Sequence, residues 1–317
     1  MKILGIVLGL LSVSLHVQAW TIPEIGTFQF NQVAKQVYVM HGPLGYPNKR
    51  NQGFMNNPGL VVGAEGLVLI DPGSTRAIGQ EVLKEAAKIS PKPVVAVFNT
   101  HIHGDHWLAN QAVKEAWPQV KIYAHPQTIE QANSGEGQRW LDLMNELTEG
   151  LSKGTRLVAP SMPVNAGGEL TIAGEVWRFH GLSPAHTDSD IMIEHVASKT
   201  LFMGDNGLNL RVGRFDSSSD IHGNMDVLEL AAKLDLWTYV PGHGSTGTKN
   251  VVVKPFLDYL KILKSVVSEG YANDQEPYEI KVEALKKLKR YEDWSGFEDE
   301  LGRHISKLYL EIEAREL

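Results

Sequence analysis

The segment Thr100-His101-Ile102-His103-Gly104-Asp105-His106 holds three histidines and one aspartate, and its side chains are those in the chain best suited to chemistry. Neutral imidazoles and carboxylates are the ligands that zinc and similar divalent metals bind. The first two histidines are two residues apart on a segment expected to be extended, so they can face one ion. The aspartate and the last histidine follow where a helix should begin, and they can face a second ion. The spacing therefore predicts a site for two neighbouring metal ions.

The alternative interpretation of this segment is an exposed polar turn that happens to be rich in histidine. The preceding residues 94–99 form a short apolar run, which is typical of a buried strand. Ionisable side chains at the end of a buried strand are costly unless they have a partner. This context favours metal binding over an exposed turn.

Three further residues have the character of metal ligands, and each follows a strand-like run: His186, Asp205 and His243. A glycine or proline beside each of them allows a tight turn that directs the side chain inward. Taken singly, each residue could instead cap or pack against a turn. Together with the first segment, they supply enough ligands for two ions.

This set of residues, in this order, resembles the metallo-β-lactamase superfamily of metallohydrolases, and the resemblance runs from about residue 26 to residue 250. It includes Leu67-Val68-Leu69-Ile70-Asp71. The implied fold is α/β, a four-layer αββα sandwich with the metals at one edge of its two sheets. The implied ligands are His101, His103 and His186 for one ion, Asp105, His106 and His243 for the other, and Asp205 bridging both. Asp71 falls where the family has an acid that orients ligands, with an ordinary strand-end turn as the alternative.

The function that the resemblance implies is hydrolysis with two divalent metal ions, for which zinc is the default and iron or manganese are alternatives. Water bound to such ions loses a proton near neutral pH and attacks as hydroxide, and Asp105 and Asp205 would serve catalysis by holding the ions. No G-x-S-x-G motif supplies a protein nucleophile. The expected substrate is a small ester, lactone, lactam or thioester. The alternative is a non-catalytic zinc-binding or metal-delivery protein that uses the same ligands.

Departures from particular family members narrow this prediction. Oxygen-reducing di-iron members have Glu at the position of His103, and one group of β-lactamases has Cys where Asp205 stands, whereas this chain has no cysteine. The basic C-terminal glutathione site of glyoxalase II-type thioesterases is not recognisable here. The N-terminus and a tail that includes Trp294, Phe297 and His304 resemble exported zinc metallohydrolases found alongside quinoprotein and sulfur-oxidation systems.

The N-terminus and the composition bear on where the protein acts and on what it binds. Residues 1–19 have a basic residue, Lys2, at their start, continue with an apolar stretch and end in Val17-Gln18-Ala19, a pattern typical of a cleaved secretory signal peptide. A membrane anchor is the alternative, but the stretch is short for a span. We therefore expect a periplasmic or secreted protein without stable membrane insertion after cleavage. A formal net charge of -7 does not suggest nucleic-acid binding, so a small-molecule substrate is the expected partner, and the sequence does not define the oligomeric state.

Strands and helices alternate along the chain, which indicates a layered α/β fold. The expected strands are 26–40, 59–63, 67–70, 94–99, 120–124, 169–181, 191–195, 200–204 and 238–240. The expected helices are 74 or 75 to 88, 105–116, 126–149 with an interruption at 134–137, and 225–234. Residues 20–250 are predicted to form the metal-binding domain, and residues 251–317 a C-terminal extension of three helices.

Substrate contacts are harder to predict than metal ligands. Residues 41–58 form a long loop that could cover the metals, and they include Tyr46, Phe54 and Met55. Aromatic and methionine side chains suit an apolar substrate, although the same side chains could pin the loop to its own core.

Four other residues are candidates for substrate contacts or for packing. Arg211 and Arg214 could bind a substrate anion, with a solvated surface as the alternative. Trp107 is expected to pack under the metal motif, and His304 to lie on the surface or to pack within the tail.

Overall fold

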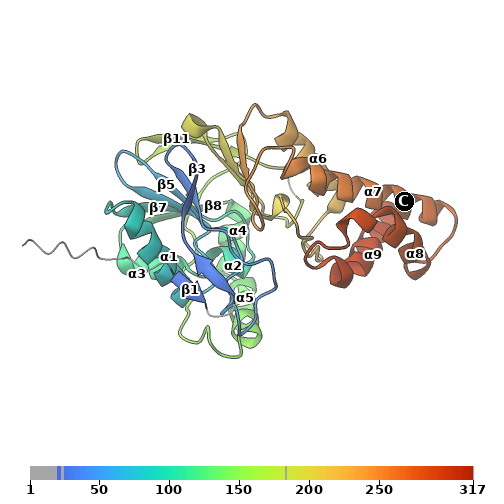
Figure 1. The fold of residues 1–317 in the computed structure, drawn as a ribbon, viewed down its shortest axis with the longest axis horizontal. Helices are drawn as coiled ribbons and strands as arrows, with labels where there is room; N and C mark the ends of the chain where they lie inside the picture. Colours follow the sequence, from blue (N-terminus) through green and yellow to red (C-terminus); the bar gives the residue numbers. More distant parts are fainter. Residues whose placement is uncertain (1–19, 23–24, 183, 317) are drawn as a thin grey trace, which may run out of the picture.

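The computed structural model describes residues 20–22, 25–182 and 184–316, so the predicted signal peptide lies outside the described residues. Two β-sheets are stacked face to face, with helices against their outer faces (Figure 1). A separate pair of short strands, β1 (Trp20–Ile22) and β2 (Gly26–Phe28), precedes them. No helix within the described residues is long and apolar enough to span a membrane.

The first sheet has seven strands in the order β3-β4-β5-β6-β7-β8-β9. They are β3 (Asn31–Ala34), β4 (Val37–Val39), β5 (Gly59–Val62), β6 (Leu67–Ile70), β7 (Val94–Phe98), β8 (Lys121–Ala124) and β9 (Met162–Pro163). From β6 to β9 neighbouring strands run parallel. The connections carry α1 (Arg76–Ile89), α2 (Gly104–Trp107), α3 (Asn110–Ala116), α4 (Pro126–Ala132) and α5 (Gly135–Leu147). Because parallel strands end at the same edge, the segments that follow β6 and β7 lie close together.

The second sheet has five strands in the order β10-β11-β12-β13-β14. They are β10 (Glu169–Ile172), β11 (Glu175–His180), β12 (Met192–His195), β13 (Thr200–Phe202) and β14 (Thr238–Val240). The last two strands are parallel and are connected through α6 (Ile221–Lys233). The segments after β13 and β14 are therefore neighbours as well.

Alternating side chains divide the interior into apolar layers. In β6, Leu67 and Leu69 join a cluster that includes Ile78 of α1, whereas Val68 and Ile70 face the other way, into the cluster between the two sheets. A further cluster lies between the second sheet and α6 together with the C-terminal helices. Three apolar layers separate four layers of structure, so the predicted αββα sandwich is confirmed.

Local differences from the predicted elements have identifiable causes. The expected strand 169–181 is a hairpin, because Ala173 (φ 56°) and Gly174 (φ 78°) turn the chain in the left-handed conformation. The expected helix 105–116 is divided between α2 and α3, and at the break the Ala109 N–H donates to the Gly73 carbonyl (2.9 Å). Helix α6 begins earlier than predicted because Asp220 caps it by accepting from the Gly223 N–H. Strands β1 and β9 were not predicted.

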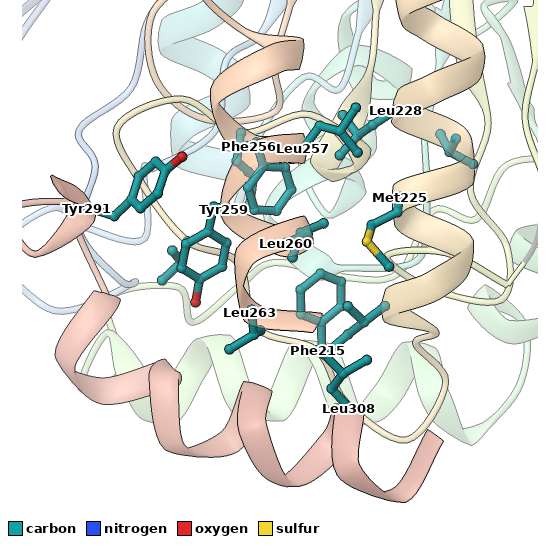
Figure 2. Close-up of a cluster of buried hydrophobic side chains, with 14 of the residues drawn as sticks. Phe215, Met225, Leu228, Phe256, Leu257, Tyr259, Leu260, Leu263, Tyr291 and Leu308 are labelled. Atoms are coloured by element: carbon teal, nitrogen blue, oxygen red, sulfur yellow. The ribbon is translucent and has the colours of Figure 1, made fainter. Parts of the chain in front are cut away.

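The C-terminal extension consists of three main helices, as predicted: α7 (Val253–Ala272), α8 (Pro277–Lys287) and α9 (Phe297–Glu316). Figure 1 shows them in orange and red beside α6. Figure 2 shows part of the shared core, in which the Phe215 ring lies between Leu260 of α7 and Leu308 of α9. The extension therefore shares a hydrophobic core with the second sheet.

His304 of α9 is fully buried, so it packs within the tail and is not a surface residue. Its Nε2 donates to the Gly213 carbonyl (2.7 Å), and its Nδ1 accepts from the Tyr259 hydroxyl (2.8 Å). Burial, with a smaller effect of Arg303, lowers the pKa of His304 to about 4 from the usual 6.5. The ring is therefore neutral in the folded protein at neutral pH.

This histidine is expected to make the folded protein acid-sensitive. Between pH 6.5 and pH 4 the unfolded chain binds a proton at His304 that the folded chain does not, so the free energy of unfolding falls as the pH falls. The contribution is at most about 1.4 kcal/mol per pH unit. His304→Gln should be less stable than wild type at pH 7.5 but should lose less stability on acidification, measured by urea unfolding at several pH values. Equal losses in the two proteins would contradict this prediction.

Candidate metal centre

The seven predicted ligands lie in segments that leave one edge of the sandwich. Four of them follow β7, in the segment that begins α2. The other three come from the second sheet: His186 in the β11–β12 connection, Asp205 in the short helix η2 (Gly204–Asn206) after β13, and His243 after β14. The topology therefore brings ligands from both sheets to one place.

Glycines make this convergence possible. Gly204, next to the predicted bridging aspartate, has φ 54°, and a side chain there would meet Thr100. A side chain on Gly242 would collide with the carboxylate of Asp205. The small residues beside the ligands thus allow the backbones to approach closely, as their positions in the sequence suggested.

The ligand atoms form two adjacent groups. One group contains His101, His103, His186 and Asp205, and the other contains Asp105, His106 and His243; within each group the atoms lie within 4.8 Å of one another. This division is the one that the resemblance implied. In the first group, His186 Nε2 lies 3.1 Å from His103 Nδ1.

Asp205 faces both groups. Its Oδ1 lies 3.2 Å from His106 Nε2 and 3.3 Å from His243 Nε2, whereas its Oδ2 lies 3.5 Å from His186 Nε2. Asp105 contributes to one side only, with its Oδ2 3.3 Å from Nε2 of both His106 and His243. One oxygen of Asp205 therefore faces each ligand group, the position that the resemblance implied for a carboxylate shared between them.

The chemistry of the donor atoms fits metal ions. Polar atoms of six of these side chains are buried without a hydrogen-bond partner: His101 Nε2, Asp105 Oδ2, His106 Nε2, His186 Nδ1, Asp205 Oδ1 and His243 Nε2. Buried polar atoms in folded proteins are almost always satisfied, and leaving them unpaired is costly. Divalent cations held between the two groups would satisfy nearly all of them at once.

Contacts on the far side of three imidazoles fix their orientation. Nδ1 of His106 lies 2.9 Å from Asp71 Oδ2, Nδ1 of His101 lies 2.9 Å from the Thr100 hydroxyl, and Nδ1 of His243 lies 2.8 Å from the Met55 carbonyl oxygen. Each of these contacts leaves Nε2 directed into the site, which is how outer partners orient metal-binding histidines. The resemblance implied Asp71 as such a partner, and its carboxylate lies where that role requires, beside His106. Nothing in the sequence indicated the Met55 carbonyl, because a backbone acceptor is independent of side-chain type.

Charges and burial within the site shift the pKa values of its ligands in both directions. Burial, together with His106 and His103, holds the pKa of His101 well below its usual range. Burial opposes ionisation of Asp105 and Asp205, but His106 and His243 outweigh it and hold both pKa values well below their usual range. A neutral imidazole and two carboxylates are the forms that ligate metals. Although burial opposes it, Asp105 and Asp205 hold the pKa of His106 well above its usual range, and Asp205 raises that of His243, so a metal that binds these two rings displaces protons.

Asp71 offers a test of the outer contacts. Its carboxylate accepts from the backbone N–H (2.8 Å) and the hydroxyl (2.7 Å) of Thr100, besides contacting His106. Asp71→Asn places an amide donor among these donors, so we expect metal affinity to fall by about 10- to 100-fold, measured by competition with a chelator. The exposed Asp226→Asn is the control. An affinity within about twofold of wild type would leave Asp71 as an ordinary strand-end turn.

A cavity of about 490 Å³ opens onto the ligands. Five of the seven line it: His103, Asp105, His186, Asp205 and His243. One wall is apolar and comes largely from α5, through Trp140, Leu143, Met144 and Leu147. These residues were not predicted, although their three-to-four spacing is the pattern of an amphipathic helix face. The cavity therefore combines the candidate metal site with an apolar surface.

The loop 41–58 contributes to this cavity only in part. Tyr46 and Met55 line it, but Phe54 does not, which corrects its assignment as a substrate contact. Phe54 is fully buried and packs against the rings of Trp20 and Phe28, because the strand pair β1–β2 provides an aromatic pocket for it. For Phe54 the alternative interpretation, packing within the loop's own core, is therefore correct.

The two arginines after Asp205 differ from each other. Arg211 is buried and lines the cavity, so it does not lie on a solvated surface. Arg214 lines the cavity but is exposed. Trp107 packs beneath the motif as expected, fully buried, with its Nε1 donating to the Ile102 carbonyl (2.7 Å).

A third group of potential ligands has a different character. Asp220, His222 and Glu311 also place ligand atoms within 4.8 Å of one another. However, Glu311 accepts from the Ile221 N–H (2.9 Å) and lies 2.8 Å from His222 Nδ1, while Asp220 pairs with Arg315 (2.8 Å). With these partners the group stabilises the N-terminus of α6, and it supplies no ligand to the predicted centre.

Comparison with known proteins agrees with this geometry. The family model described as the metallo-beta-lactamase superfamily matches residues 51–243. A probable metallo-hydrolase of Methanocaldococcus jannaschii is 25% identical over 206 residues, which make up 62% of this chain and 91% of that protein.

Two solved structures share the fold. A metallo-beta-lactamase from Pontibacter korlensis superposes with a TM-score of 0.59 at 18% identity and covers 74% of this chain and 99% of its own. A sec-alkylsulfatase from Pseudomonas sp. superposes with a TM-score of 0.68 at 20% identity and covers 90% of this chain and 50% of its own. The family model covers more than half of the chain and includes every predicted ligand, so the chain belongs to the metallo-beta-lactamase superfamily.

Proposed function

We propose that the protein is a hydrolase that uses two divalent metal ions, by default zinc, to cleave a small ester, lactone, lactam or thioester. The observation that carries this proposal is the convergence of buried, unpartnered nitrogen and oxygen atoms beside a cavity large enough for a small molecule. Such ions, when bound, lower the pKa of water and polarise a substrate oxygen.

The residues of the chain have distinct roles in this proposal. Asp205 holds the two ligand groups together, and Asp105 completes the second group. Contacts with Asp71, Thr100 and the Met55 carbonyl hold the imidazole rings of the ligands in a fixed orientation before substrate arrives. Little reorganisation is therefore required during the reaction.

The cavity wall indicates what part of the substrate is bound beside the metals. The side chains of Trp140, Leu143 and Met144 from α5 present an apolar surface, which would take the hydrocarbon part of a substrate and exclude water from it. A sulfate ester is a further substrate class worth testing, because the similar sec-alkylsulfatase matches a share of the chain that extends into the C-terminal helices.

The alternative function is non-catalytic zinc binding or metal delivery. A structural site is usually closed by protein ligands, whereas a catalytic site keeps access for water. Here five of the ligands line an open cavity, which favours the enzyme. We further propose that the protein is exported by means of its N-terminal segment and acts in the periplasm or outside the cell.

The proposal is tested with zinc-loaded protein on chromogenic esters, lactones, thioesters, β-lactams and sulfate esters. We expect turnover of at least one class, its loss on treatment with a chelator and its return when zinc is added. Protein that binds two ions but turns over no class in the panel, and instead transfers zinc to an acceptor chelator, would favour metal delivery.

A further inference from the structure

Arg211 is a buried cation in the wall of the cavity, with 5% of its surface exposed. Its Nη1 donates to the carbonyl oxygens of Leu44 and Gly45, both at 3.2 Å. Within the described part of the chain, no carboxylate forms an ion pair with it, and no hydrogen bond uses its Nε or Nη2. A buried charge that lacks a countercharge is costly, so a negative group on a ligand would stabilise the site.

The acidic side chains of the same wall are already engaged. Glu136 forms an ion pair with Arg139. Asp216 lies 3.9 Å from His103 Nε2 and accepts from the Ser218 hydroxyl (2.7 Å). These contacts leave Arg211 as the buried wall residue with unused charged donors.

The guanidinium is held in place by the loop above it. Its carbon lies 5.1 Å from the centre of the Tyr46 ring, a distance at which a cation is attracted to the face of an aromatic ring. Tyr46 also lines the cavity. Since its ring contacts the guanidinium, the position of the ring determines where Nε and Nη2 of Arg211 lie in the cavity wall.

The C-terminal extension holds both the Tyr46 side chain and the Leu44 carbonyl in place. The Tyr46 hydroxyl donates to Glu300 Oε1 of α9 (3.0 Å), and Glu300 is 1% exposed. The Ser295 hydroxyl donates to the Leu44 carbonyl (2.8 Å). The backbone of Ser295 also bonds on both sides of Arg211, donating to Leu210 O and accepting from Val212 N, each at 3.0 Å. Residues 295–300 therefore join the loop 41–58 to the segment that follows Asp205.

We propose that Arg211 binds an acidic group of the substrate, and that Glu300 is a positioning residue that places it through Tyr46. The inference rests on the proposed hydrolytic function and adds two elements to it. The substrate carries a negative charge near its reacting bond, and the C-terminal extension completes the substrate site.

The test compares two esters of similar size, 4-nitrophenyl hydrogen succinate, which is acidic, and 4-nitrophenyl butyrate, which is neutral. In zinc-loaded protein, Arg211→Gln should raise KM for the acidic ester about 10-fold or more, the effect of losing a hydrogen bond to a charged group. KM for the neutral ester should rise by a clearly smaller factor, so the measured quantity is the ratio of the two KM values, which should change about 10-fold. Arg178→Gln, an exposed arginine on β11 paired with Glu169, makes the same change of charge and is the control.

The role of Glu300 is tested by removing and then restoring its acceptor. Glu300→Ala and Tyr46→Phe each break the bond between these residues and should raise KM for the acidic ester about 3- to 10-fold. Glu300→Gln keeps an oxygen acceptor for the tyrosine hydroxyl and should restore KM to near the wild-type value. Glu298→Gln, an exposed residue in the same turn of α9, should behave as wild type.

Binding measurements separate this inference from the proposed function. Calorimetry with benzoate and with its neutral analogue benzamide should show a preference for benzoate that Arg211→Gln reduces about 10-fold or more. If no ester is turned over but this preference falls, the anion site stands and the hydrolytic proposal fails. If Arg211→Gln affects both esters and both binding probes equally, the anion site is wrong. If Glu300→Gln is as impaired as Glu300→Ala, Glu300 does not act through the hydroxyl of Tyr46.

Discussion

Replacing Asp205 with Asn is expected to lower the metal content of the protein by about one ion per chain. Asn keeps the shape of the side chain but removes the charge that faces both ligand groups, with contacts of 3.2 Å to His106 and 3.5 Å to His186. Turnover should fall by more than the roughly 10- to 100-fold that loss of an outer contact costs, because a ligand common to both groups is lost. Elemental analysis and steady-state kinetics of the variant measure the two effects.

The alternative role for Asp205 gives a different result. If this aspartate only caps a turn, Asp205→Asn should cost about 1 kcal/mol of stability and leave metal content unchanged. Asp235→Asn, an exposed aspartate paired with Lys199, provides the control for a change of charge alone. Thermal melting and metal analysis of the two variants decide between the interpretations.

Removal of the metals is expected to abolish activity and to lower the melting temperature by at least about 5 °C. Without cations, two ionised aspartates and several unpartnered imidazole nitrogens remain buried together. A ligand present at about 1,000 times its dissociation constant adds about 4 kcal/mol to the free energy of unfolding. Scanning calorimetry with and without chelator measures the shift, and reconstitution should return about two ions per chain.

The same calorimetric comparison, with and without chelator, on the Asp205→Asn variant is the internal control. That variant should show a smaller shift on chelation, because it starts with fewer ions. A reconstituted wild-type content near zero, or an unchanged melting temperature after complete metal removal, would contradict a centre built from these residues.

The layered α/β class and the position of the ligands after strands were predictable because local signals determine them, whereas the αββα arrangement and the division of the ligands were implied by the resemblance to the family. An apolar run such as Val94–Phe98 marks a buried strand, and the residues that follow parallel strands meet at one edge. Glycines such as Gly204 and Gly242 indicate where backbones approach closely. Both the apolar run and the glycines can be recognised without knowing which distant segment packs against them.

The substrate wall was not predictable in the same way, because its geometry depends on contacts between distant segments. Arg211 is held in the interior by hydrogen bonds to Gly45 and Leu44, which lie 166 and 167 positions earlier in the chain. His304 lies on a helix rich in Lys and Glu, yet its partners are 45 and 91 residues away. The local pattern around such residues resembles that of a solvated surface, and only the tertiary structure shows otherwise.

The hydrogen bond from His243 to the Met55 carbonyl has a consequence for how molecules reach the reaction centre. Asn57 of the same loop donates to the carbonyls of Pro241 and Gly244, at 2.9 and 2.8 Å, so this stretch is bound to the backbone on both sides of His243. An outward movement of residues 55–57 would break the hydrogen bond between His243 and the Met55 carbonyl, so this part of the loop is a fixed wall of the cavity. Arrival of substrate and departure of product must therefore use the rest of the cavity rim, whose lining residues include the exposed Leu147 of α5 and Arg214. We expect the residues of that rim, and not those of the loop, to control how fast product leaves.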